Sequence, residues 1–212
     1  MRAGGAKAGV WAGVLTVLLA VAAAQAEERL VLEPYPGAAW HEVINQANGP
    51  RFIRQQVPAD QTLQNFNDSL TAQSFPGQQG AAADVIGVIF NQFSQVCDMV
   101  ETVGPKVSAE QGREVAYGQL FCGQQKGTTY GVHMFIKVIR GNEAFYVVNR
   151  DFRTPPSDHP GAPSFAKGQE KQALALLQAE AEASRYLTER VYLCDPVFPD
   201  PKCSGDAVVT GR

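Results

Sequence analysis

The sequence predicts an α+β protein, in which a mainly antiparallel sheet of five or six strands packs with about three helices. Segments of alternating apolar residues occur in pairs, and Asn48-Gly49 and Gly141-Asn142 favour tight hairpin turns between them. Other segments have apolar residues at helical spacing. Strands come first, helices follow, and strands return before a last helix. That order favours an antiparallel sheet with helices covering at least one face.

Residues 1–26 have the three parts of a secretory signal peptide. Arg2 and Lys7 form a basic start, Val10 to Val21 is apolar, and Ala24-Gln25-Ala26 is a small-residue cleavage site. A membrane anchor is the alternative, but the apolar run is shorter than the about 20 residues that a spanning helix needs. We expect cleavage after Ala26 and a periplasmic or secreted product.

The rest of the chain is long enough for one domain. We expect a single α+β domain over residues 27–193, followed by a disulfide-closed turn and a frayed tail over 194–212. No later stretch is apolar enough for a stable membrane span. The net charge of −3 and the lack of a Lys/Arg run argue against nucleic acid as a partner.

Alternating segments predict the strands of the first half. Arg29 to Glu33 reads as a short strand that ends at a Pro-Tyr-Pro-Gly turn. Trp40 to Gln46 and Arg51 to Val57 should pair around Asn48-Gly49 as a hairpin.

Three segments have helical periodicity. The first starts at Asp60 or Thr62 and runs to Phe75, before Pro76-Gly77. The second, Asp84 to Glu101, has a wide apolar face and should lie largely buried on the sheet. The third is Gln169 to Leu193.

The second half contains the clearest hairpin. Glu114 to Gly123 predicts a strand, and Tyr130 to Arg140 should pair with Glu143 to Arg153 around Gly141-Asn142. This turn places Ile136 opposite Val147, and Lys137 opposite Tyr146. One face of the hairpin is aliphatic and should be core. It consists of Val132, Met134, Ile136, Val138, Phe145 and Val147.

The other face of this hairpin is mixed and supplies the candidate binding residues. His133, Lys137, Tyr146 and Arg150 point the same way, and Arg54 joins them if its strand is a neighbour. Three cations and a tyrosine on a sheet face could hold an anionic ligand or an acidic partner. The alternative is that the cations extend over a helix and pair with its acids.

The four cysteines predict two disulfides, because an even number in an exported chain favours pairing. Three connectivities are possible. We favour Cys97–Cys122 and Cys194–Cys203, since each pair is close in sequence and belongs to one structural unit. A zinc site is disfavoured, because the spacings lack a Cys-x-x-Cys and no histidine lies near a pair.

No motif in this sequence identifies a catalytic chemistry or a cofactor. The sequence lacks GxSxG, HExxH, a Walker loop and GxGxxG. His41, His133 and His159 are scattered, so solvated or packed histidines are expected rather than a metal site. We therefore assign no catalytic residue, no metal and no cofactor.

Three stretches together are similar in their order to a known fold: Trp40 to Val57, Asp60-Gln61-Thr62 through Phe75, and Gly127 to Arg153. In this order the chain resembles PsbP/Mog1-like α/β/α sandwich domains and small exported bacterial proteins of unassigned function. The resemblance implies a binding or assembly module rather than an enzyme.

The sequence therefore favours an exported, non-catalytic envelope protein that binds a partner or ligand through its sheet face. The partner would be an unknown envelope protein or an anionic ligand. A periplasmic hydrolase with an unrecognised site and an inhibitor of a foreign hydrolase are the alternatives. A pocket with convergent polar groups would favour a ligand binder or an enzyme, and a flat apolar patch would favour a protein partner.

Overall fold

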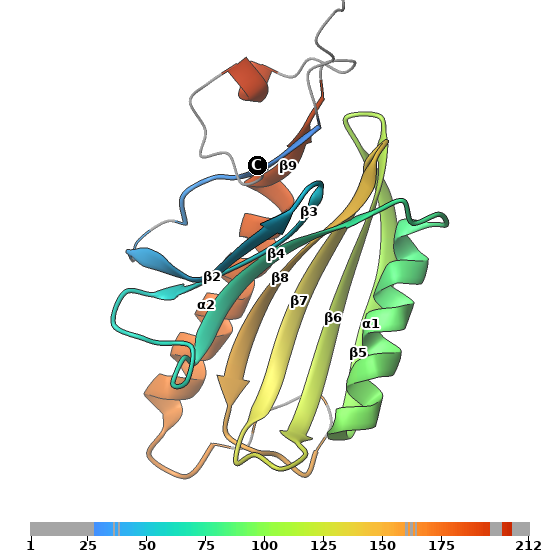
Figure 1. The fold of residues 1–212 in the computed structure, drawn as a ribbon. Coiled ribbons are helices and arrows are strands. Elements are labelled where there is room, and N and C mark those ends of the chain that lie inside the picture. Colours follow the sequence, from blue (N-terminus) through green and yellow to red (C-terminus); the bar gives the residue numbers. More distant parts are fainter. Residues whose placement is uncertain are drawn as a thin grey trace, which may run out of the picture.

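A seven-stranded antiparallel sheet with a helix on each face forms the body of this protein (Figure 1). The computed structural model describes residues 28–35, 37, 39–159, 161, 163, 165–195 and 201–204. The expected signal peptide and the end of the expected tail lie outside these residues. Neither helix of the described part combines the length and the apolar character that crossing a membrane requires.

The strand order of the large sheet is β2-β3-β4-β8-β7-β6-β5. A second sheet pairs β1 with β9, and a short 3-10 helix, η1, follows it. The bounds of the strands and helices are β1 Arg29–Leu32, β2 Trp40–Asn48, β3 Arg51–Pro58, β4 Asp68–Pro76, α1 Ala82–Val96, β5 Cys97–Glu110, β6 Arg113–Gln125, β7 Gly131–Arg140, β8 Ala144–Thr154, α2 Glu170–Glu189, β9 Val191–Cys194 and η1 Pro201–Ser204.

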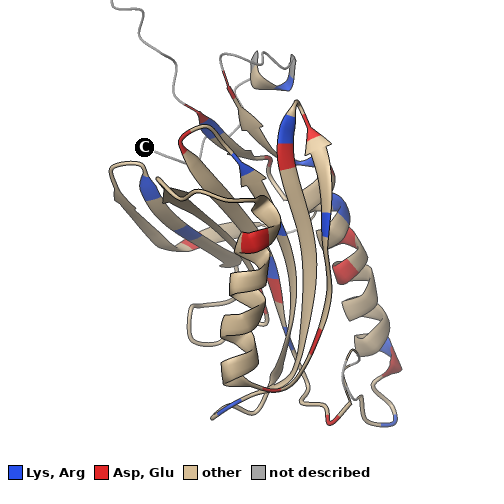
Figure 2. Cartoon of the chain, turned by 90° about the vertical axis from the view of Figure 1, so that its right-hand side faces the viewer, with Lys and Arg blue, Asp and Glu red and all other residues tan. Residues whose placement is uncertain are grey.

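The two helices lie on opposite faces of the large sheet, as Figure 2 shows. Helix α1 packs on β5, β6 and β7, and its buried Ala82 and Ile86 join the aliphatic face of the β7–β8 hairpin. We call this side the α1 face. The aliphatic residues that the sequence assigns to the core all belong to this cluster.

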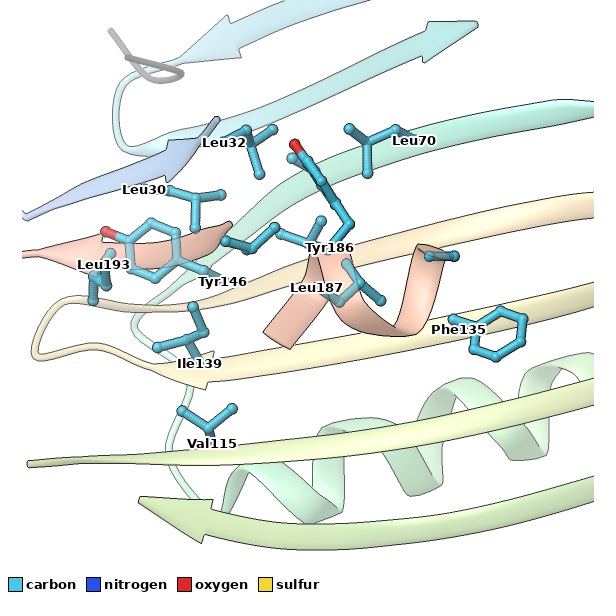
Figure 3. Close-up of a cluster of buried hydrophobic side chains, with 14 of the residues drawn as sticks. Leu30, Leu32, Leu70, Val115, Phe135, Ile139, Tyr146, Tyr186, Leu187 and Leu193 are labelled. Atoms are coloured by element: carbon cyan, nitrogen blue, oxygen red, sulfur yellow. The ribbon is translucent and has the colours of Figure 1, made fainter. Parts of the chain in front are cut away.

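The opposite side, the α2 face, contains the larger core. Ala183, Tyr186 and Leu187 of α2 pack against side chains of β3, β4, β6, β7 and β8 (Figure 3). Leu30 and Leu32 of β1 and the residues of β9 complete this cover. Because both faces are covered, every residue of β7 from Gly131 to Ile139 is buried.

The expected α+β class and antiparallel sheet are confirmed, but the helix expected over residues 60–75 is wrong. Asp68–Pro76 forms strand β4, which pairs with β3 on one side and β8 on the other. Leu70 and Ala72 point into the α2-face core. Pairing with β8 along the whole strand, and with β3 over Leu70 to Gln73, outweighs the helical spacing of Leu63, Phe66 and Leu70, which is a weak local preference.

The other two expected helices are shorter than the sequence indicates, and each is followed directly by a strand. Helix α1 ends at Val96 and β5 begins at Cys97. Helix α2 ends at Glu189, and β9 begins at Val191 and pairs with β1. Strand β5 continues past Gly104-Pro105, with a register shift between Val103 and Lys106. A proline is tolerated there because β5 is an edge strand and needs no donor on its open side.

The β7–β8 hairpin is confirmed, but its register differs from the expected one. Ile136 pairs with Asn149, and Lys137 pairs with Val148. The pairing continues to Gly141, whose N–H donates to the carbonyl of Ala144, so Asn142 and Glu143 occupy the turn. The shift is two residues, and side chains alternate with a period of two, so each stays on its expected face.

Both expected disulfides are confirmed. Cys97–Cys122 joins the start of β5 to β6, and Cys194–Cys203 joins the end of β9 to η1. The Cα–Cα distance is 5.6 Å in each pair. Disulfides of this kind are typical of proteins from oxidising compartments.

Two valines on one rung of the α1 face test how strongly the sheet centre is buried. Val107 of β5, Ala116 of β6 and Val138 of β7 are successive partners, but Val138 is 0% exposed and Val107 is 54% exposed. Val138→Asp would bury an unpaired charge and should lower the free energy of unfolding by about 4 kcal/mol or more. Val107→Asp should change it by less than about 1 kcal/mol. Urea unfolding measures both, and equal effects would contradict this burial pattern.

Candidate functional site

The five residues that the sequence proposes for binding lie on one face of the sheet. The register pairs Arg54 with Ala72, Ala72 with Val148, and Val148 with Lys137, so these side chains project to the α2 face. His133, Tyr146 and Arg150 project to the same face, because they lie an even number of residues from Lys137 or Val148. The expected common orientation is therefore present.

The α2 face is covered, however, and four of the five residues are buried. Arg150 is 2% exposed, and its guanidinium donates two hydrogen bonds of 2.6 Å to Asp68. The rings of Tyr35 and Trp40 lie over the guanidinium, with centroids 3.9 and 4.5 Å from Cζ. Arg150 therefore holds β4 and the β1–β2 connection against β8.

The other members have internal contacts as well. His133 Nδ1 lies 2.6 Å from Glu180 Oε1 of α2. Tyr146 is packed in the α2-face core, and Arg54 lies 3.6 Å from Glu42 across the β2–β3 hairpin. Their part in binding stays a prediction, and these contacts give each of them a structural role.

Lys137 lies beside a groove on the same face. The cavity has a volume of about 460 Å³ and lies between the end of α2 and strands β5, β6 and β7. This volume is in the usual range for small-molecule sites. Its walls combine apolar, hydroxyl, amide and charged side chains. They are Val103, Gly104, Lys106, Ser108, Glu110, Tyr117, Gly118, Gln119, Phe135, Ile136, Ser184, Leu187 and Thr188.

Glu110 and Tyr117 line one wall of the groove and form a hydrogen-bonded triad with Lys137, which is buried behind Glu110. Lys137 Nζ donates to Glu110 Oε2 at 2.7 Å and to the carbonyl of Val191 at 2.6 Å. The hydroxyl of Tyr117 donates to Glu110 Oε1. Both carboxylate oxygens therefore have a donor, and the triad connects β5, β6, β7 and β9.

Burial shifts the pKa values of Lys137 and Tyr117. It lowers the pKa of Lys137, although the Glu110 carboxylate partly opposes the change. Burial also raises the pKa of Tyr117, and the hydrogen bond to Glu110 raises it further. The tyrosine is therefore a neutral donor at neutral pH. The groove wall presents a neutral hydroxyl and a neutralised ion pair, while Lys106 at the exposed β5 edge adds one positive charge.

Sequence reasoning found Lys137 but missed the groove and two members of the triad. Strand β5 was not predicted from the sequence, because Gly104-Pro105 resembles the end of a helix. The signal that could have found it is the alternation after Pro105. Lys106, Ser108 and Glu110 point to one face, and Val107 and Ala109 point to the other.

No group of three or more His, Cys, Asp or Glu side chains in the described ranges is placed to hold a metal ion. The arrangement can bind a molecule by burial, hydrogen bonds and charge. The polar groups of the groove come from four elements, so a bound molecule would contact β5, β6, β7 and α2 together.

Comparisons with known proteins give structural resemblances alone. No known protein family matches this chain, and no curated protein matches it in sequence. Among solved structures, one match is LpqN of Mycobacterium tuberculosis, described as involved in cell envelope biogenesis. The TM-score is 0.40 and the identity 12%, over 80% of this chain and 85% of that one.

A second match is the cyanobacterial PsbP protein of Synechocystis sp. PCC 6803. The TM-score is 0.35 and the identity 14%, over 77% of this chain and 94% of that one. The weak resemblance to PsbP-like proteins that the sequence indicates is therefore present in the structure as well.

A double-mutant cycle tests the Lys137–Glu110 pair. Glu110→Ala should lower the free energy of unfolding by about 3 kcal/mol, because it leaves the Lys137 ammonium buried without its carboxylate. Adding Lys137→Met should restore most of this loss, because no buried charge remains. Glu33→Ala is the control, since Glu33 lies 3.8 Å from Arg190 in a partly exposed pair. It should cost less than about 1 kcal/mol. The single change Lys137→Met completes the cycle. Urea unfolding of the wild type, the two single variants, the double variant and the control measures the coupling, and additive losses would contradict the pairing.

Proposed function

We propose that this chain is an exported, non-catalytic binding protein that holds an anionic ligand in the groove between α2 and strands β5 to β7. The observation that carries the proposal is the groove itself, which lies on the sheet face where the sequence expects binding. A soluble, organic molecule that combines an apolar body with an acidic group fits the composition of its walls.

Export is supported by the two disulfides and by the signal-like pattern of residues 1–26. Disulfides persist in oxidising compartments such as the periplasm or the extracellular space. The charge pattern and the apolar run at the start of the chain are those that the secretion machinery recognises. An envelope location would place the groove in contact with exported or externally supplied molecules.

The preference for an anion follows from the charges around the groove. Lys106 lines the groove at the exposed edge of the sheet, and Lys137 lies behind Glu110. Glu110 is the one acid among the lining residues, and Lys137 and Tyr117 already donate to it. An acidic group near Lys106 gains a charge-assisted hydrogen bond. An apolar body gains contact with Val103, Phe135 and Leu187.

Two dyes with related aromatic systems and different charge test this function. We expect the anionic dye 8-anilinonaphthalene-1-sulfonate to bind the folded protein and to bind more tightly than neutral N-phenyl-1-naphthylamine. Lys106→Glu should weaken the anionic dye by about tenfold, the equivalent of one charge-assisted contact, and leave the neutral dye unchanged. Fluorescence titration measures both dissociation constants.

Two further variants separate the groove from the rest of the surface. Gln119→Trp places a large ring in the groove and should abolish binding of both dyes. Lys171→Glu reverses an exposed charge on α2 that does not line the groove, and it should change neither. If Lys106→Glu and Lys171→Glu weaken the anionic dye equally, the groove is not its site. If Gln119→Trp binds both dyes normally, the proposed function is wrong.

A further inference from the structure

The α1 face of the sheet changes character where it passes from β7 to β8, β4 and β3. Near α1 it is aliphatic, with Val132, Met134, Ile136 and Val138 in the core. Farther across the sheet, beyond Phe145 and Val147 of β8, the same face carries a group of polar residues. We call its residues the polar patch: Gln55 of β3, Ser69, Thr71 and Gln73 of β4, and Asn149 and Asp151 of β8.

The register shows that the polar patch is continuous across three strands. Gln55 pairs with Thr71, and Thr71 pairs with Asn149, so these three form one rung. Ser69 pairs with Asp151 on the next rung, and Gln73 lies on the rung at the other side. Successive rungs on one face are two residues apart, so the six side chains are neighbours. Gln55, Thr71 and Gln73 are partly exposed.

Part of the hydrogen-bonding capacity of the patch is used within it. Asn149 Nδ2 donates to Asp151 Oδ2 at 2.6 Å, Ser69 Oγ donates to the same oxygen at 3.4 Å, and Gln55 Nε2 donates to Ser69 Oγ at 3.2 Å. These bonds hold the inner members in fixed positions. The patch is therefore preorganised by its own side chains.

Other hydrogen-bonding groups of the polar patch have no partner within the described residues. Within the described residues, Asp151 Oδ1 is buried and has no hydrogen-bond partner. Among those residues, no hydrogen bond is formed by the Thr71 hydroxyl or the Gln73 amide. Unpaired polar groups on a partly covered sheet face are costly unless water or a ligand satisfies them. The remaining amides and hydroxyls both donate and accept, as the hydroxyls of a sugar also do.

An aromatic and cationic cluster lies on the same face at the end of β8. The Arg153 guanidinium stacks on Phe66 and Tyr130, with Cζ 3.8 and 4.5 Å from the ring centroids. Arg153 is two residues beyond Asp151, so it projects to the α1 face beside the patch. Arg153 covers one face of each ring, and Tyr130 also packs on the α1-face core, so the partly exposed ring of Phe66 is the apolar surface beside the amides and the carboxyl that a pyranose ring could contact.

We propose that the polar patch, together with Phe66, is a binding site for a neutral oligosaccharide. Five of the six patch residues are neutral and polar, and the charges at the site are the Asp151 carboxyl and the neighbouring Arg153, which is stacked on the rings; neutral hydroxyl groups therefore match most of the site. An anionic ligand would face Asp151, and a cationic one would leave the amides and hydroxyls without a role. The site is on the face opposite the groove, so each can be tested while the other stays intact.

The Asp151 carboxyl gives the patch a pH-dependent stability. Burial raises its pKa to about 7, although Asn149 and Ser69 oppose the change. The unfolded carboxyl titrates near pH 4, so the native state binds more protons between about pH 4 and pH 7. The free energy of unfolding should therefore fall as the pH rises through this window. Asp151→Asn should remove that loss. Urea unfolding at pH 4 and pH 8 measures the free energy of unfolding of the wild type and of Asp151→Asn. If it changes by the same amount in both proteins, the pKa of Asp151 is not raised.

Maltotetraose and chitotetraose are the neutral probes for the site, and trigalacturonate is the anionic control. Two-dimensional amide NMR of the whole protein follows each titration to millimolar concentrations. The neutral probes should shift the side-chain amide signals of Gln55, Gln73 and Asn149, and trigalacturonate should not. No shift from either neutral probe, or shifts from the anionic probe alone, would overturn the proposal.

Matched variants show whether the patch itself binds. The double change Thr71→Val and Gln73→Leu keeps the shapes of two partly exposed side chains and should weaken binding by about tenfold or more. Thr188→Val removes a hydroxyl from the groove and should leave sugar binding unchanged. Phe66→Ala is a second variant that leaves the strands untouched, and it should weaken binding through the loss of the ring. Near-UV circular dichroism checks that each variant is folded, and unchanged affinity in both patch variants would refute the site.

Discussion

The rest of the structure depends on the burial of strand β7 on both faces. An antiparallel sheet usually exposes one face to water, but here α1 covers one side of β7, and α2 with β1 and β9 covers the other. Any charge on β7 therefore needs a partner from another element. Lys137 has Glu110 of β5 and the Val191 carbonyl of β9, and His133 has Glu180 of α2. These two polar side chains of β7 thus connect the sheet to the elements that cover it.

The groove and the polar patch both arise where a helix stops covering the sheet. Helix α2 leaves the outer part of β5 and β6 partly open, and there the side chains change to Lys106, Ser108 and Gln119. On the other side, α1 packs on β5, β6 and β7, and the face turns polar at β8, β4 and β3. On both faces, therefore, the side chains under a helix are mainly apolar and more of those beyond it are polar, as expected when the burial of apolar surface drives packing.

Local chemistry was sufficient to predict the hairpins and both disulfides, but not the elements that depend on distant partners. Asn48-Gly49 and the turn after Arg140 act within a few residues, so they can be read from the chain. Strand β4 has helical spacing and becomes a strand because β3 and β8 pair with it. The candidate cations were found by alternation along β7 and β8. Glu110 was not, because its position depends on the pairing of β5 with β6.

The pairing of β1 with β9 brings the two ends of the described fold together. Arg29 lies opposite Cys194, and the Cys194–Cys203 disulfide joins the end of β9 to η1. A short linker could therefore join these ends, and new ends could be opened in the loop between β8 and α2. Such a circularly permuted chain would keep every strand pair of the large sheet. An affinity tag or a surface tether could then be attached at the new ends, in the loop between β8 and α2, instead of at the present ends.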